Sequence, residues 1–131
     1  MSLPLVYVDM SRVREGALEE LKGAIGELAE FVDANVPRVL AYSVYFNDEG
    51  SEMTVVHVHP DSASLEYHLD VAGPAFAPFA DLLTLSAIRV YGEPSERVRQ
   101  QLENKARLLG CRDVAVHRPN AGFSRFGIAA A

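Results

Sequence analysis

Hydrophobic and polar positions alternate along four stretches of the chain and recur every three or four residues along three longer ones. A period of two is typical of a β-strand with one buried face, and a period near 3.6 is typical of an amphipathic helix. The alternation predicts strands over residues 3–10, 38–46, 53–59 and 82–92. The longer spacing predicts helices over about 15–34, 62–73 and 95–110, and residues 113–117 are expected to add a short edge strand.

Local signals support these boundaries. The turn-forming sequence NDEGSE joins the second and third strands, which predicts a hairpin. Asp61, Ser62 or Ser64 is expected to cap the second helix, and Ser95 the third. Residues 118–131 are expected to form a loop. Two glycines at positions 23 and 26 weaken the first helix, and we expect a neighbouring strand to approach closely there.

The order of elements is strand–helix–strand followed by strand–helix–strand. This order predicts an α+β fold of the ferredoxin-like βαββαβ type with an antiparallel sheet. Residues 1–131 are expected to form a single domain with its core at 3–92 and an added helix and short strand at 93–131. Helices lie on one face of such a sheet. The opposite face needs a cover, and a second copy of the chain is the expected one.

The side chains of each strand were assigned to the two faces by how aliphatic each set is. The mostly aliphatic set is expected to face the helices: Val6, Val8, Met10, Thr54, Val56, Val58, Ser86, Ile88 and Val90, with Leu40, Tyr42, Val44 and Phe46 from the second strand. The open face is then expected to carry Tyr7, Asp9, Met53, Val55, His57, His59, Leu85, Ala87, Arg89 and Tyr91. Two such faces packed as a homodimer would enclose a mainly apolar cavity with a few polar groups, which is typical of a small-molecule site.

Composition excludes several classes of partner. The chain has 131 residues and a net charge of −6, with no basic block, so nucleic acids and anionic membranes are not expected partners. Cys111 is the only cysteine, so an intrachain disulfide cannot form. A leader peptide and a membrane-spanning run are both missing from the pattern, which predicts a cytoplasmic protein. No G-x-G-x-x-G, P-loop or nucleophile elbow occurs.

One resemblance rests on the pattern of residues 3–92. The motif SLEYHLDVAGPAFAPF has His68 followed by Leu69 and a later phenylalanine, and YGEPSE follows the fourth strand. With the hairpin into an aliphatic strand, this part of the chain resembles the antibiotic biosynthesis monooxygenase-like domains of the dimeric α/β-barrel superfamily. The resemblance implies a homodimer with pockets between helices and barrel. It also implies cofactor-free oxidation of phenolic or quinol-type molecules in some members.

The haem-degrading branch of that superfamily typically has an asparagine on the first strand and a tryptophan in the second helix. This chain has Asp9 at the first position and no tryptophan at all. Haem degradation is therefore not expected, and the absence of tryptophan also departs from the quinone-forming oxygenases.

His57 and His59 point the same way on one strand, roughly 6.5–7 Å apart at Cα. With Asp9 they match the ligand types of a two-histidine, one-carboxylate iron site. The alternative is that both histidines form hydrogen bonds across the dimer or line a pocket. We favour this alternative and predict neither metal nor cofactor, because a lone H-x-H lacks the spacing of a multi-ligand motif.

His68 lies on an apolar helical stripe, so it is either a buried core residue or a pocket residue. The resemblance favours the pocket, where His68 or His57 would act as a base toward a phenolic proton. Arg89 would either hold the resulting anion or pair with Asp9 or Glu52.

Tyr7, Tyr45 and Tyr91 would either stack on an aromatic ligand or form part of a dimer interface, and Asp9 and His59 complete the expected ligand-binding set. The sequence thus favours a monooxygenase-like protein that binds or oxidises a small aromatic or quinol-type molecule. The alternative is a non-catalytic homodimer that binds a small molecule or serves a structural role. Whether the chain is an enzyme stays open at this point.

Overall fold

A computed structural model of the chain describes residues 3–126. Its strands are β1 (Leu5–Val13), β2 (Ala41–Phe46), β3 (Glu52–His59), β4 (Leu83–Tyr91) and β5 (Val114–His117). Its α-helices are α1 (Leu18–Asn35), α2 (Ser62–Ala72) and α3 (Glu96–Leu108), and two 3₁₀ turns, η1 (Gly73–Ala75) and η2 (Ala77–Asp81), connect α2 to β4. All eight elements expected from the sequence are present. The loop expected at 118–131 is confirmed up to residue 125, and residues 127–131 lie outside the described part.

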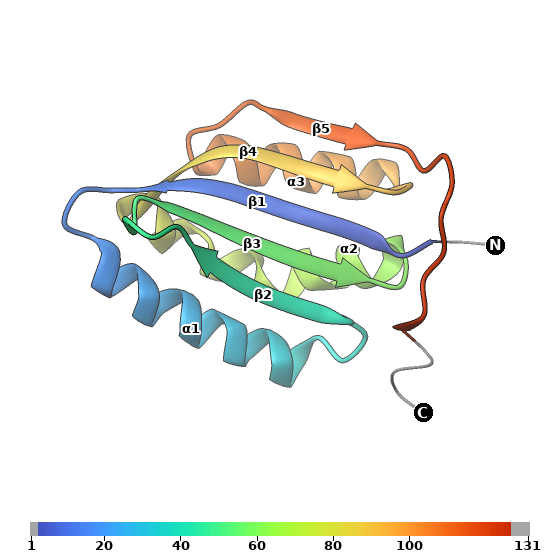
Figure 1. The fold of residues 1–131 in the computed structure, drawn as a ribbon, viewed down its shortest axis with the longest axis horizontal. Helices are drawn as coiled ribbons and strands as arrows, with labels where there is room; N and C mark the ends of the chain where they lie inside the picture. The colour runs from blue at the N-terminus through green and yellow to red at the C-terminus, as the bar shows by residue number, and fades with distance from the viewer. Residues whose placement is uncertain (1–2, 127–131) are drawn as a thin grey trace.

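The strands form one sheet in the order β2-β3-β1-β4-β5 (Figure 1). The first four strands pair antiparallel, which is the predicted ferredoxin-like arrangement, and β5 adds in parallel to β4. In Figure 1 the sheet faces the viewer, and α2 and α3 pass behind it. The α+β fold class is therefore confirmed, including the added helix and edge strand.

The sequence signals at the element ends act as expected. Asp61 caps α2 by accepting a hydrogen bond from the Ser64 amide at 2.9 Å. The Ser95 side chain caps α3 by accepting from the Val98 amide at 3.1 Å. In the β2–β3 turn, the Asn47 side chain accepts from the amides of Ser51 and Glu52, both at 2.9 Å, and so fixes the hairpin.

The core lies between the sheet and the three helices. Each helix turns one apolar stripe inward, and the buried helical residues are Leu21, Ile25, Leu28 and Val32 of α1; Leu65, His68, Leu69 and Ala72 of α2; and Val98, Leu102 and Ala106 of α3. Tyr42, Val44 and Phe46 of β2 pack against this core, as predicted, whereas Leu40, expected on the same face, precedes β2 and is exposed. These contacts place α3, part of the added segment, in the same core as the first two helices.

The face assignment of β1 and β3 was wrong. The buried residues that point toward the helices are Leu5, Tyr7, Asp9, Ser11, Met53, Val55, His57 and His59, and Val58 is the one buried residue of the described parts of these strands on the opposite face. Val6, Val8, Met10, Thr54 and Val56 are partly exposed on the opposite face. Aliphatic content alone therefore does not identify the buried face of these strands. In the fold, the buried set combines the largest side chains with polar groups, and small β-branched residues cover the open face.

A β-bulge explains the mixed outcome on β4. Met10 pairs with Ala87 and Ser11 pairs with Leu85, so Ser86 has no partner across the ladder. The extra residue reverses the alternation, and Leu83, Leu85, Ile88 and Val90 therefore all face the helices. Ile88 and Val90 were placed correctly, as were Arg89 and Tyr91 on the open face. Leu85 and Ser86 were exchanged, because strict alternation does not hold through the bulge.

The expectation for Gly23 and Gly26 was also wrong. A Cβ atom built on either glycine would meet no atom within 4 Å, so no strand approaches them closely. Gly92 is the position where a close approach does occur, with φ at +138° and Leu5 Cδ2 only 2.6 Å from a built Cβ. The chain therefore requires glycine where β4 ends, and not in α1.

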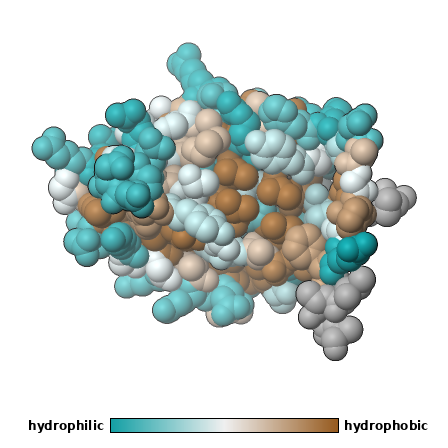
Figure 2. All heavy atoms as spheres, in the orientation of Figure 1, coloured by the Kyte–Doolittle hydropathy of each residue, from teal (hydrophilic) through white to brown (hydrophobic). Residues whose placement is uncertain are grey.

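The open face of the sheet is apolar at its centre. Figure 2 shows this face in the orientation of Figure 1, with hydrophobic residues gathered over the middle of the sheet. The side chains that β1, β3 and β4 direct to it include Val6, Val8, Met10, Val56 and Ala87. Apolar patches of this kind on a sheet usually mark a partner surface.

Candidate functional site

A small cavity of about 30 Å³ lies between the sheet and the helices, on the side opposite the open face. Its walls are mostly apolar, and a few polar side chains enter from different elements. The polar lining residues are Asp9, Ser11, Tyr42, His57, His68 and Lys105. A mainly apolar cavity with converging polar groups is the usual form of a small-molecule site, although this one has room only for something close to the size of water.

An ion pair stands at one wall of the cavity. Lys105 Nζ, from α3, donates to Asp9 Oδ2 at 2.8 Å and to the Tyr7 hydroxyl oxygen at 2.7 Å. The Tyr7 hydroxyl in turn donates to the same carboxylate oxygen at 3.0 Å. The side chains of Asp9 and Lys105 are each only 8% exposed. The Lys105 ammonium also lies 4.1 Å from the centre of the Phe76 ring, a cation–π contact.

Three buried histidines form the other polar part of the site. The His57 ring stacks on Tyr7 with centroids 4.3 Å apart and meets the edge of Tyr42 at 4.5 Å. The His68 ring, from α2, lies 5.0 Å from that of His57 and 5.5 Å from that of His59. The rings of His57 and His59 lie 6.1 Å apart, so the three rings form a triangle beneath the helices.

Burial makes these histidines neutral groups. Burial lowers the pKa of His68 to about 3, helped by the positive charge of Lys105, and lowers the pKa of His59 to about 4. Burial also holds the pKa of His57 well below its ordinary value, with His68 and Lys105 adding to the effect. Near neutral pH each ring is therefore uncharged, with one nitrogen that accepts a hydrogen bond and one that donates.

Burial raises the pKa of the two neighbouring tyrosines. The pKa of Tyr7 is held well above its ordinary value by burial and by the negative charge of Asp9, and the pKa of Tyr42 is raised by the same two causes. Both phenols therefore stay protonated at neutral pH. They act in the site as hydrogen-bonding groups and not as anions.

Several polar atoms of the site have no hydrogen-bond partner within residues 3–126. These atoms are Asp9 Oδ1, both ring nitrogens of His57 and of His68, and His59 Nε2. Buried polar groups in folded proteins are nearly always hydrogen-bonded, and an unsatisfied one costs about 1–3 kcal/mol. Such a concentration at one place is characteristic of a site that receives a polar molecule.

His59 differs from the other two histidines. Its Nδ1 shares a 2.8 Å hydrogen bond with the Ser64 hydroxyl, and Ser64 is itself buried. His59 does not line the cavity, whereas His57 and His68 do. This hydrogen bond connects the end of β3 to the first turn of α2.

The structure separates the residues that the sequence grouped together. Tyr7, Asp9, His57, His59 and His68 meet beneath the helices. Arg89, Tyr45 and Tyr91 lie on the other side of the sheet, where Tyr45 is 57% and Tyr91 43% exposed. Tyr91 stacks there on His117 with centroids 5.2 Å apart.

The partner predicted for Arg89 was wrong. Its guanidinium binds the carboxylate of Asp113 through two hydrogen bonds of 2.9 and 3.0 Å, and not Asp9 or Glu52. Arg89 thus ties β4 to the segment that leads into β5, and the cation of the buried site is Lys105.

Sequence reasoning missed Lys105, although the pattern contained a signal for it. The apolar stripe of α3 includes Val98, Leu102 and Leu109, and position 105 completes the spacing of four, three and four residues. A lysine at a core position is rarely buried without a partner. The only lysine on this stripe therefore indicated a buried carboxylate, which is Asp9.

Among the described residues, no group of three or more His, Cys, Asp or Glu side chains is arranged to hold a metal ion. His57 Nε2 lies 3.9 Å from Asp9 Oδ2, and this carboxylate oxygen is the one that binds Lys105. No helix within residues 3–126 is long and apolar enough to cross a membrane.

The fold is similar to those of several solved structures. The crystal structure of MupZ from Pseudomonas fluorescens superimposes with a TM-score of 0.74 at 18% identity, covering 98% of this chain and 94% of that one. SnoaB, a cofactor-independent oxygenase from Streptomyces nogalater, gives 0.59 at 17% identity, covering 70% of this chain and 94% of that one. A putative antibiotic biosynthesis monooxygenase from Chloroflexus aurantiacus gives 0.56 at 17%, covering 67% and 90%.

No family model and no curated protein sequence matches the chain. The fraction of this chain that superimposes differs between these structures. The similarity to SnoaB and to the Chloroflexus protein leaves about a third of this chain unmatched, whereas the similarity to MupZ extends over nearly all of it. The resemblance predicted from residues 3–92 is therefore confirmed at the level of structure: the chain has the fold of the antibiotic biosynthesis monooxygenase-like domains.

Proposed function

We propose that the chain is a monooxygenase-like protein that binds a small molecule with an acidic hydroxyl, of phenolic or quinol type, in the cavity beneath its helices. The observation that carries the proposal is the cluster of unpartnered polar atoms on Asp9, His57 and His68 within apolar walls. The shared fold supports it further, because SnoaB is a cofactor-independent oxygenase with this architecture.

The arrangement suits a hydroxyl-bearing ring. Neutral histidines and a carboxylate oxygen accept hydrogen bonds from such a hydroxyl, and the walls around them are aromatic or aliphatic. Removing the hydroxyl proton gives an electron-rich anion that can react with oxygen. In this proposal His68 or His57 binds the hydroxyl, Lys105 supplies the positive charge near the resulting anion, and the apolar walls exclude water.

The size of the cavity sets a condition. A ring needs far more room than about 30 Å³. Phe76, between the two 3₁₀ turns, and Phe79, within η2, are the large side chains that line it from the segment between α2 and β4. Binding therefore requires these two rings to move outward.

Oxygen uptake by the purified protein with a panel of dihydroxy-aromatics tests the proposal. We expect uptake above the rate without protein, and we expect His68→Ala and His57→Ala to reduce it at least tenfold. Lys22→Met, which alters an exposed lysine of α1, serves as the control and should retain the rate. Equal rates for the wild type and both histidine variants would contradict the catalytic part.

The open face supports a second element of the proposal, a homodimer. Its apolar centre (Figure 2) is the type of surface that a second copy covers. In the homodimer Arg89, Tyr45 and Tyr91 would lie at or near the interface. A charged substitution at its centre, Val56→Lys, is expected to convert a dimer to a monomer in sedimentation experiments, and a wild-type chain that sediments as a stable monomer at micromolar concentration would contradict this element.

The small cavity favours one alternative, a non-catalytic homodimer whose interior is packed shut. Under that alternative the polar cluster holds one or two water molecules and serves only the fold. Phe79→Ala separates the two functions. Enlarging the cavity should increase binding of small phenols if the site is functional, and it should only lower stability if the interior is structural.

A further inference from the structure

We propose that Asp9 is the group that takes the proton from the bound hydroxyl, and that Lys105 on the C-terminal helix is the positioning residue that keeps Asp9 ionised and balances the anion formed. The inference rests on the proposed function and assigns its base. It also gives the added segment after residue 92 a role in the site.

The two carboxylate oxygens of Asp9 differ in their hydrogen bonds. Oδ2 is fully used, because it accepts from Lys105 at 2.8 Å and from Tyr7 at 3.0 Å. Oδ1 is buried and has no partner within residues 3–126, although Asp9 lines the cavity. One oxygen is thus anchored and the other is available to a ligand hydroxyl. Within residues 3–126, Asp9 is also the only carboxylate that lines this cavity.

The Lys105 ammonium is buried beside the Asp9 carboxylate. Its ammonium contacts Asp9, the Tyr7 hydroxyl and the Phe76 ring, and these three groups enclose it. A buried ammonium is stable only beside an anion, and a buried carboxylate only beside a cation. Each charge of this pair therefore holds the other in its ionised form.

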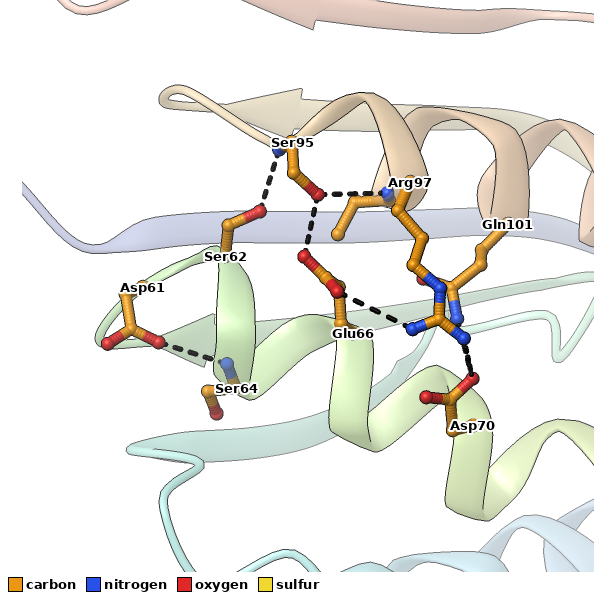
Figure 3. Close-up of polar contacts among 9 residues, drawn as sticks. Asp61, Ser62, Ser64, Glu66, Asp70, Ser95, Arg97 and Gln101 are labelled. Carbon is orange, nitrogen blue, oxygen red and sulfur yellow. Dashed lines mark hydrogen bonds and ion pairs between the residues drawn. The ribbon is translucent and has the colours of Figure 1, made fainter.

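Contacts between α2 and α3 hold Lys105 at the cavity. Helix α3 is fastened to α2 by a row of polar contacts (Figure 3). The Ser95 amide donates to Ser62 Oγ at 2.7 Å, and the Ser95 hydroxyl donates to Glu66 at 2.8 Å. Arg97 and Gln101 both donate to Asp70, at 2.8 and 2.9 Å. These contacts fix the helix on which Lys105 lies two turns further along.

The two histidines of the cavity are weaker candidates for the base than Asp9. His57 and His68 lie close to Lys105, and a proton on either ring would place a second positive charge beside the ammonium. Tyr42 on β2 lines the cavity and Tyr7 on β1 donates to Asp9, and both are protonated phenols that accept no further proton. Among residues 3–126, the Asp9 carboxylate is the only anionic group that lines the cavity and can accept the proton of a ligand hydroxyl.

The transfer leaves the charge of the site unchanged. The ligand O–H bond breaks, a new O–H bond forms on Asp9 Oδ1, and the negative charge passes from the carboxylate to the ligand oxygen. Lys105 then faces a neutral carboxylic acid and an adjacent oxyanion, so its ammonium stays paired throughout. No electron transfer is involved in this step, which makes it separable from any later reaction with oxygen.

A chromophoric phenol tests the inference without turnover. We would add 4-nitrophenol to the protein in oxygen-free buffer, at a pH where the free phenol is neutral, and record the absorption of its anion. The wild type should bind it as the phenolate. Asp9→Asn should reduce the anion signal at least tenfold, while the control Lys22→Met should retain it. No phenolate signal in the wild type, or an equal signal in Asp9→Asn, would overturn the proposal.

The role of Lys105 needs a readout beyond loss of activity, because Lys105→Met also removes a buried charge. Lys105→Arg keeps the charge and should restore at least a third of the phenolate signal that Lys105→Met loses. A phenolate signal that Lys105→Met retains in full, or that Lys105→Arg does not restore, would show that the charge of Lys105 does not act on the base.

The two experiments fail independently. Bound phenolate without oxygen uptake would contradict the monooxygenase-like function and leave the base assignment in place. Oxygen uptake that survives Asp9→Asn but not His68→Ala would support the function and overturn the base assignment.

Discussion

The buried pair of Asp9 and Lys105 should behave as one energetic unit. The two charges lie 2.8 Å apart with side chains only 8% exposed. At an effective dielectric constant of about 20, Coulomb attraction at that distance is about 6 kcal/mol before desolvation is subtracted. Removing one partner leaves a buried charge without compensation, which typically costs about 3–5 kcal/mol, whereas replacing both partners is often close to neutral.

A double-mutant cycle measures this coupling. We expect Lys105→Met and Asp9→Asn each to lower the free energy of unfolding by about 3–5 kcal/mol. The double variant should lose only about 1–3 kcal/mol, because it buries no net charge and leaves one amide imperfectly paired. Asparagine retains an acceptor for the Tyr7 hydroxyl, and methionine retains the contact with Phe76. The coupling energy is therefore at least about 3 kcal/mol.

Urea unfolding at pH 7, followed by circular dichroism, gives these values. The matched control is Lys22→Met on α1, where Lys22 lies 3.9 Å from Glu19 and both side chains are largely exposed. An exposed pair contributes little, so this variant should lie within about 0.5 kcal/mol of the wild type. A Lys105→Met protein as stable as the control, or a cycle in which the two single losses simply add, would refute the reasoning.

Three further outcomes are expected. Gly23→Ala and Gly26→Ala should each raise the free energy of unfolding by about 1 kcal/mol, because both sites are open helix positions; a loss in urea unfolding would indicate an unseen contact. Gly92→Ala should lower it by about 1–3 kcal/mol, since its φ of +138° and the nearby Leu5 side chain disfavour a Cβ; an unchanged thermal midpoint would argue against this. Burial lowers the pKa of His59 to about 4, so below about pH 6.5 the unfolded chain takes up a proton that the folded chain does not, and stability falls by about 1.4 kcal/mol per pH unit down to about pH 4. His59→Gln should reduce the slope of stability against pH by that amount, and an identical slope in both proteins would count against the buried neutral histidine.

The order and type of the elements followed from the sequence because local signals specify them. Alternation, helical spacing and the caps at Asp61 and Ser95 act over a few residues and need no knowledge of the rest of the chain. The added helix and edge strand were found by the same means. The fold class therefore followed as soon as the elements were in order.

The faces of the strands did not follow, because they depend on contacts between distant segments. The unpaired Ser86 reverses the alternation of β4, and a bulge leaves no mark in the hydrophobic pattern of one strand. On β1, the burial of Asp9 depends on a lysine that follows 96 residues later. Without that partner, the more aliphatic set of β1 was expected to face the helices, which left Asp9 on the wrong face.

The separation between Asp9 and Lys105 has a consequence for synthesis. During synthesis Asp9 leaves the ribosome 96 residues ahead of Lys105, which supplies its counter-charge. Until Lys105 emerges, β1 carries an unmatched carboxylate that resists burial. A prematurely terminated product that ends before α3 would therefore lack both a stable interior and a working centre, and quality-control proteases would meet it as an incompletely folded chain.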